Sequence, residues 1–204
     1  MTIRAIVFDI GDVLEINPDT GWQEKWENCL HIDFNQVFEQ LERTGRNGSL
    51  GTCTEEEWIQ GLREITAMSQ AQTDEFMADL WHWYLGTLNH DLTTFFAGLR
   101  PQYQTAILSN SFVGAREKEQ DAYRFHEMTD QIIYSHEVGL EKPDKRIYEL
   151  TCQRLALRPD EIIFLDDAES NIMAALTYGI HGILFKDNEQ AIADIQACIR
   201  ANAL

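Results

Sequence analysis

The period of the hydrophobic positions changes twice along the chain. Residues 6–8 form a short apolar run that stops at Asp9, with Gly11 close behind, a pattern that predicts a buried parallel strand opening into a tight turn. From residue 15 to about residue 88 the apolar positions recur with the period of a helix. From residue 90 onward, helix-like and strand-like segments alternate. A sheet is therefore expected to begin at the first strand and to be completed only after a helical interruption.

The interruption predicts four amphipathic helices with no strand between them. Asp33 is expected to cap the second helix, Thr54 opens a capping box for the third, and the fourth is expected to begin near Thr73. Such helices can bury their apolar faces only against each other, so they predict a small bundle inserted after the first strand. We interpret its aromatic residues as bundle core rather than as a ligand site.

The remainder of the chain predicts an α/β fold. A helix is expected over residues 91–99, another opens at Pro143, and a later one stops at Gly179. The further strands are expected at residues 105–108, 132–134, 162–165 and 182–185. Strand–helix units of this length imply a parallel sheet with right-handed crossovers and helices on both faces.

Charge and cysteine content restrict the partners. The 204 residues carry a formal net charge of −18, which should repel nucleic acid and anionic membranes, and which means that an anionic substrate needs a local cation. The chain has no apolar run of membrane-spanning length, and we expect neither a signal peptide nor a membrane helix. The widely spaced Cys29, Cys53, Cys152 and Cys198 are interpreted as reduced, mostly buried thiols, so a cytoplasmic location is expected.

Polar residues follow three of the expected strands. Asp9 ends the first, Ser109 the second, and the pair Asp166 and Asp167 the fourth, while Lys142 lies in the loop before a helix. Ligands of open α/β sheets bind beyond the carboxyl ends of the strands, so these side chains meet if the strands are neighbours. Each residue also has a simpler interpretation: Asp9 as a turn residue, the Asp pair as helix caps, and Lys142 as a solvated loop charge.

Clustered carboxylates call for a cation. Several carboxylates a few ångströms apart repel one another unless a divalent cation compensates them, and oxygen-only ligands favour Mg²⁺ over zinc. The metal and Lys142 then attract a phosphate group, and Ser109 with adjacent backbone N–H groups holds its oxygens. Asp9 is left free to attack phosphorus, forming an aspartyl phosphate that water later hydrolyses.

In this order, the motifs resemble the haloacid dehalogenase superfamily of aspartate-nucleophile hydrolases over nearly the whole chain. The matching segments are Phe8–Leu14, Leu108–Asn110, Lys142–Asp144 with Ile147 and Tyr148, and Phe164–Asp167 with Asn171, Ala174 and Ala175. The resemblance implies a Rossmann-like core of residues 1–14 and 89–204, and makes residues 15–88 a mobile four-helix cap.

The resemblance also implies roles for individual residues. Asp9 is the nucleophile and a metal ligand, Gly11 offers its carbonyl to Mg²⁺, Asp167 binds the metal directly, and Asp166 binds it directly or supports it. The phosphate is bound by Ser109, Asn110 and Lys142, of which Lys142 also restrains the nucleophile and counts as catalytic. Asn171 is expected to orient the acidic loop.

One position departs from the pattern of the superfamily. Its phosphatases usually carry a second Asp two residues after the nucleophile as general acid and base, and here that position is Gly11. Asp12 follows the turn and is not assigned this role. Loss of a general acid costs about a hundredfold or more and matters least for a good leaving group. A branch resembling phosphatases of glucose 1-phosphate also has Gly there, so a sugar phosphate is the preferred substrate class.

Three functions remain open. The first is a Mg²⁺-dependent phosphomonoester hydrolase acting on a small phosphorylated metabolite as a monomer or homodimer; the second is a 2-haloacid dehalogenase, against which the Asp166–Asp167 pair argues. The third is a protein that binds Mg²⁺ and a phosphorylated ligand without turnover, because Gly11 replaces the general acid. Trp22, Arg43 and Arg46 are candidates for substrate specificity, with core packing or surface charge as the alternative for each.

Overall fold

The computed structural model describes residues 2–203, and its centre is a five-stranded parallel sheet with the strand order β5-β4-β1-β6-β7. The strands of this sheet are β1 (Ala5–Phe8), β4 (Gln104–Ser109), β5 (Gln131–Tyr134), β6 (Ile162–Asp166) and β7 (His181–Leu184). Each lies within one or two residues of its predicted position. The sheet confirms the predicted Rossmann-like α/β class.

The central strand β1 is fully buried and pairs with β4 on one side and β6 on the other. Phe8, its last residue, stands opposite Ile107 of β4 and Leu165 of β6. This register places the residue after β1 beside the last residues of both neighbouring strands. The polar residues at the ends of these three strands are far apart in the sequence but therefore lie at the same edge of the sheet.

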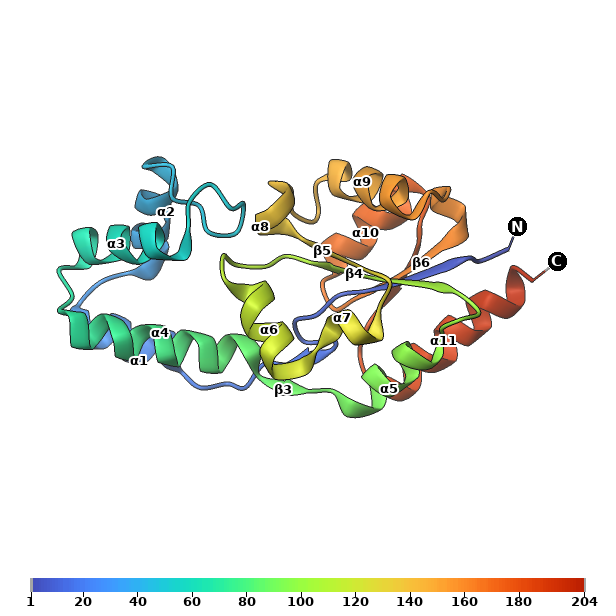
Figure 1. Cartoon of the computed structure of the whole chain (residues 1–204), viewed down its shortest axis with the longest axis horizontal. Helices are drawn as coiled ribbons and strands as arrows, with labels where there is room; N and C mark the ends of the chain where they lie inside the picture. The colour runs from blue at the N-terminus through green and yellow to red at the C-terminus, as the bar shows by residue number, and fades with distance from the viewer. Residues whose placement is uncertain (1, 204) are drawn as a thin grey trace.

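Helices cover both faces of the sheet, as the strand–helix alternation predicted (Figure 1). On one face, α5 (His90–Gly98) and α11 (Asn188–Ala201) pack Phe96 and Ile195 against Phe8 and Ile107. On the other face lie α9 (Lys145–Leu155) and α10 (Glu169–Tyr178). The shorter elements between strands are α6 (Ala115–Tyr123), α7 (Phe125–Met128), α8 (Ser135–Val138) and the 3₁₀ turn η1 (Pro159–Glu161).

Four of the five helices between β1 and β4 form the end of the molecule farthest from the two chain termini (Figure 1). They are α1 (Trp22–Leu30), α2 (Phe34–Arg43), α3 (Glu55–Thr66) and α4 (Gln70–Leu85). We call them the helical insertion. Their inward faces form a separate hydrophobic cluster rich in aromatic residues, in which Trp22 and Phe34 both contact Phe76. The division into two domains stays a prediction.

A short antiparallel ribbon that the sequence did not reveal joins the helical insertion to the sheet. It pairs β2 (Glu15–Ile16) with β3 (Thr87–Leu88). Gly86 precedes β3 with φ 58° and ψ −137°, and a Cβ there would lie 2.3 Å from the carbonyl oxygen of Ile16. Glycine is required at this crossing because other residues rarely adopt that backbone conformation.

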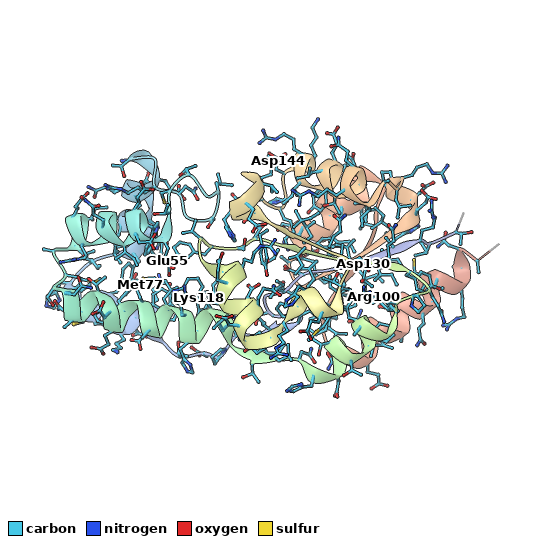
Figure 2. The ribbon with its side chains drawn as sticks, viewed as in Figure 1. Glu55, Met77, Arg100, Lys118, Asp130 and Asp144 are labelled. Carbon is cyan, nitrogen blue, oxygen red and sulfur yellow. The ribbon has the colours of Figure 1, made fainter. Side chains whose placement is uncertain are left out.

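One polar contact ties the helical insertion to α6. Lys118 of α6 and Glu55 of α3 are labelled in Figure 2, and the Lys118 Nζ lies 3.0 Å from the Glu55 Oε2. The Trp81 indole of α4 donates a hydrogen bond of 2.8 Å to Glu55, and Lys118 also lies over its ring. Three helices therefore meet through one partly buried ion pair.

Several predicted details are wrong. The fourth helix begins at Gln70, because Ser69 and Gln72 form a capping box, and not near Thr73. The helix expected to open at Pro143 begins at Lys145, with Asp144 as its cap. Only Cys152 is a buried cysteine, because Cys29 is exposed and Cys53 and Cys198 are partly exposed. Within residues 2–203, no helix has the length and apolarity needed to span a lipid bilayer.

Candidate active site

The carboxyl ends of β1, β4 and β6 gather the polar residues predicted from the sequence. Asp9 follows β1, Ser109 ends β4 and Asp166 ends β6, and all three side chains are nearly or fully buried. One carboxylate oxygen from each of Asp9, Asp166 and Asp167 lies within 4.8 Å of the other two. The expected convergence of these carboxylates therefore occurs.

Lys142 is the buried cation of this cluster. Its Nζ lies 2.7 Å from the Asp9 Oδ1 and 2.7 Å from the Asp166 Oδ2, and it also donates to the Leu108 carbonyl at 3.0 Å. Asn110 clamps the backbone of Lys142: its amide nitrogen donates to the Lys142 carbonyl and its oxygen accepts from the Lys142 N–H, both at 2.8 Å. The lysine is thus held from both its backbone and its ammonium end.

Asp166 is held by a second set of donors. The Asn171 amide donates to both carboxylate oxygens at 3.0 and 3.1 Å, and the Ala168 N–H donates to Oδ1 at 2.8 Å. The Tyr148 hydroxyl in turn donates to the Asn171 carbonyl at 2.9 Å. These bonds orient Asp166 toward Lys142, and Asn171 occupies the place from which it was expected to orient the acidic loop.

Burial and charge act in opposite directions at this site. Burial raises the pKa of Asp9 above its ordinary value, against the attraction of Lys142, and nearby Asp166 raises it further. Burial and the charge of Asp166 likewise raise the pKa of Asp167. For Lys142, burial lowers the pKa, but attraction to Asp9 and Asp166 outweighs it and the net shift is upward. The ammonium group of Lys142 therefore stays charged, but it does not fully compensate the carboxylates around it.

The donor set fits a divalent cation. Three carboxylates face a single ammonium group, so two negative charges of the cluster lack compensation when all are ionised. The donors are hard oxygens, which suit Mg²⁺. The Oδ1 of Asp9 accepts from Lys142 and from the Ile10 N–H at 2.8 Å. The Oδ2 is therefore not used by Lys142 or by the Ile10 N–H.

The other predicted site residues differ in what they contact. Ser109 is buried at the end of β4, whereas both polar atoms of the Asn110 amide are hydrogen-bonded to the backbone of Lys142. Trp22 and Arg46 line a cavity of about 450 Å³ that also reaches Asn110 and Ser111. Arg43 instead pairs with Glu39 on the exposed surface of α2.

Sequence reasoning missed three polar residues near the site. Glu15 and Glu119 are buried, and neither oxygen of Glu15 finds a hydrogen-bond partner within residues 2–203. Burial, then Glu119 and Asp9, raise the pKa of Glu15 well above its ordinary value. Asn17 bridges the turn after β1 to the end of α4. An acid directly after an apolar run was a usable signal for Glu15, but Asn17 depends on partners far along the chain.

Comparison with known proteins identifies the family of the chain. The model of the haloacid dehalogenase-like hydrolases matches residues 3–179. The chain belongs to the haloacid dehalogenase-like hydrolase family. A solved structure with the same fold is that of the HAD family enzyme bt-2542 from Bacteroides thetaiotaomicron, in complex with magnesium and inorganic phosphate. The TM-score between the two structures is 0.77, at 22% sequence identity. The match covers 93% of this chain and 98% of that one.

Relatives in this family carry more than one activity. The chain is 36% identical over 193 residues to (S)-2-haloacid dehalogenase 1 of Pseudomonas sp. (strain CBS-3), covering 89% of this chain and 83% of the relative. It is 25% identical over 179 residues to D-ribitol-5-phosphate phosphatase of Bacteroides thetaiotaomicron, covering 83% and 85%. It is 29% identical over 208 residues to acyl-CoA dehydrogenase family member 10 of Mus musculus, covering 96% of this chain but spanning only 19% of that relative.

Proposed function

We propose that this protein is a Mg²⁺-dependent phosphomonoester hydrolase that acts on a small phosphorylated metabolite through an aspartyl phosphate on Asp9. The observation that carries the proposal is the cluster of Asp9, Asp166 and Asp167, of which Asp9 and Asp166 pair with one buried lysine. A carbon–halogen bond gains nothing from crowded carboxylates, whereas a phosphate ester needs the cation that they attract.

Each residue has a defined task in this reaction. Asp9, Asp166, Asp167 and the Gly11 carbonyl would hold Mg²⁺, which supplies positive charge against the phosphate oxygens. Lys142 binds a phosphate oxygen and fixes the Oδ1 of Asp9, so that the Oδ2 faces phosphorus. The Oδ2 forms a bond to phosphorus while the ester bond breaks, and the leaving alkoxide takes a proton from water. Water then hydrolyses the aspartyl phosphate.

The helical insertion is the proposed cap over this site. The cavity between it and the sheet joins Trp22 and Arg46 to the loop after β4, so specificity would depend on residues of both parts. Closure of such a lid excludes water during phosphoryl transfer. We expect the enzyme to act in the cytoplasm, as a monomer or homodimer.

A sugar phosphate is the proposed substrate class. An anomeric phosphate leaves with little proton donation, which suits a site with Gly11 where a general acid usually stands. A relative that acts as a D-ribitol-5-phosphate phosphatase supports a small phosphorylated polyol as substrate, and a structural neighbour solved with magnesium and phosphate supports phosphate chemistry.

The direct test is release of phosphate from p-nitrophenyl phosphate and from a panel of sugar phosphates. We expect turnover that requires Mg²⁺, is abolished by EDTA, and falls by roughly a thousandfold or more in Asp9→Asn, because the nucleophile is lost. Asp144→Asn, at the partly exposed cap of α9, serves as the control. Full turnover in metal-free buffer would contradict the proposal.

A dehalogenase is the second candidate because of the 36% identical relative. Attack of Asp9 on the carbon of 2-chloropropionate would release chloride without a metal. Chloride release that persists in EDTA, without phosphatase activity, would establish this alternative. A binding protein without turnover would instead gain thermal stability from Mg²⁺ and a sugar phosphate while releasing no phosphate over hours.

A further inference from the structure

Asn17 stands over the open position beside the proposed nucleophile. An ideal Cβ built on Gly11 would lie 3.7 Å from the Asn17 Oδ1, and no other heavy atom of residues 2–203 beyond the chain neighbours comes within 4 Å of it. The backbone of Gly11 has no positive φ, so the space is not needed to relieve strain. The structure thus has an empty position faced by one amide oxygen.

This space is close to Asp9, because Gly11 is only two residues farther along the chain, in the turn that follows β1. Ile10, between the two residues, is buried in the hydrophobic cluster, whereas Gly11 is partly exposed. The backbone N–H of Asn17 donates to the side chain of Asp12, so Asn17 borders the same turn.

The orientation of the Asn17 amide is fixed by three hydrogen bonds. Its Nδ2 donates to the carbonyls of Trp83 and Tyr84, both at 2.8 Å, and its backbone N–H donates to the Asp12 Oδ1 at 3.1 Å. The two carbonyls belong to the last turn of α4, where no intrahelical donor is available to them. Because both acceptors require the nitrogen, the oxygen must face Gly11.

We propose that the Asn17 Oδ1 positions the water that hydrolyses the aspartyl phosphate; this rests on the proposed function. An amide oxygen accepts a hydrogen bond from water but takes no proton, as is known for the glutamine that orients water in GTPases. The water oxygen bonds to phosphorus and the bond from phosphorus to Asp9 breaks, returning its electron pair to the carboxylate. One water proton passes to a phosphate oxygen, and dihydrogen phosphate is the product.

The role concerns only the second half of the reaction. Asn17 offers an acceptor in the reactive position and therefore no proton for the leaving alkoxide. Its loss should slow release of phosphate from Asp9 without slowing formation of the aspartyl phosphate. The first step sets kcat/KM, whereas a slowed second step appears in kcat.

The test is pre-steady-state hydrolysis of p-nitrophenyl phosphate with Mg²⁺ by Asn17→Ala. We expect kcat to fall roughly 10- to 100-fold with kcat/KM unchanged. We also expect a burst of nitrophenolate approaching one per active site, because phosphorylated Asp9 accumulates. Tyr123→Phe is the matched control: the Tyr123 hydroxyl donates to the Leu85 and Gly86 carbonyls at the same end of α4, at 3.1 and 3.0 Å, and does not face Gly11.

A second variant leaves Asn17 and its bonds intact. Gly11→Ala puts a methyl group into the space that the water would use, so we expect the same burst and the same fall in kcat. An unchanged kcat in both variants, or a parallel fall of kcat and kcat/KM without a burst, overturns the role of Asn17. So does an equal effect of Tyr123→Phe. If the wild-type protein releases no phosphate from any ester, the proposed function fails first and this inference with it.

Discussion

The Nζ of Lys142 lies 2.7 Å from the Oδ1 of Asp9, and both side chains are almost completely shielded from water. The same ammonium lies 2.7 Å from Asp166, so one positive charge serves two buried carboxylates. The lysine is therefore part of the folded core as well as of the proposed phosphate site. Removal of its charge should affect stability and catalysis together.

Lys142→Met should lower the free energy of unfolding by about 3–5 kcal/mol in metal-free buffer, because two buried carboxylates lose their partner. Added Mg²⁺ should restore part of this loss by compensating the same carboxylates. Urea unfolding with and without Mg²⁺ measures both effects. Lys145→Met, at the exposed start of α9, should change stability little, and equal losses in the two variants would contradict the prediction.

Glu119 should make stability depend on pH. Burial raises its pKa to about 8 from 4.5, while the hydroxyls of Tyr134 and Tyr84 and the charge of Arg116 oppose the rise and Asp9 adds to it. Between these pH values the folded state holds a proton that the unfolded state has lost, so stability falls as pH rises. Its contribution is complete below pH 4.5 and is lost above pH 8.

Glu119→Gln should therefore match the wild type near pH 4.5 and exceed it near pH 8. The gain is at most about 1.4 kcal/mol for each pH unit between these limits. Chemical unfolding over this range gives the comparison, with Glu117→Gln on the exposed side of α6 as the charge control. A constant difference at every pH would refute the titration of Glu119.

Gly11→Asp should increase kcat/KM, which reports formation of the aspartyl phosphate, for esters with poor leaving groups. The open position beside Asp9 accepts a Cβ at ordinary contact distance from Asn17, and a carboxylic acid there can protonate the leaving alkoxide. General acid catalysis contributes about 10²- to 10⁴-fold, so alkyl phosphates should gain more than p-nitrophenyl phosphate. The pH profile of kcat/KM should acquire a new descending limb. Equal effects on both kinds of ester would show that no proton is donated.

Gly86→Ala should destabilise the protein by about 2–4 kcal/mol, because the new Cβ would lie 2.3 Å from the Ile16 carbonyl oxygen at a positive φ. Displacement of Ile16 by this Cβ should also move Asn17, which follows Ile16 in the chain, and should lower kcat. Gly98→Ala at the end of α5 is the control, since its Cβ meets no atom of the described residues within 4 Å. Thermal unfolding together with steady-state kinetics checks both expectations, and an unaltered melting temperature for Gly86→Ala would contradict them.

Much of the core was predictable because local pattern and tertiary position agree there. The run before Asp9 is buried on both faces, so its apolar side chains predict a central strand, and the acids after β1 and β6 mark the edge where strands end. The two-residue strands β2 and β3 leave no periodic trace, because such short segments contain too few alternating positions. In β2 the buried residue is the acidic Glu15 and the exposed residue is the apolar Ile16, the reverse of the usual strand pattern.

The contacts of Asn17 could not be predicted from the sequence for a different reason. An Asn before a proline indicates a turn, which is a local preference, whereas its two acceptors come from the end of a helix 66 and 67 residues away. The buried Glu119 is similar, because its surroundings depend on how α6 packs against β5. Side chains that bridge distant elements acquire their role only from the folded arrangement.

The ribbon of β2 and β3 brings the chain back to the point at which it left the sheet. Leu14, just before β2, accepts a hydrogen bond of 2.8 Å from the N–H of Asn89, just after β3. A short turn across this gap would close the backbone with every strand of the sheet in its present register. Removal of the intervening helices would accordingly leave the strand ends and their carboxylates in place, but would take away the two carbonyls that orient Asn17.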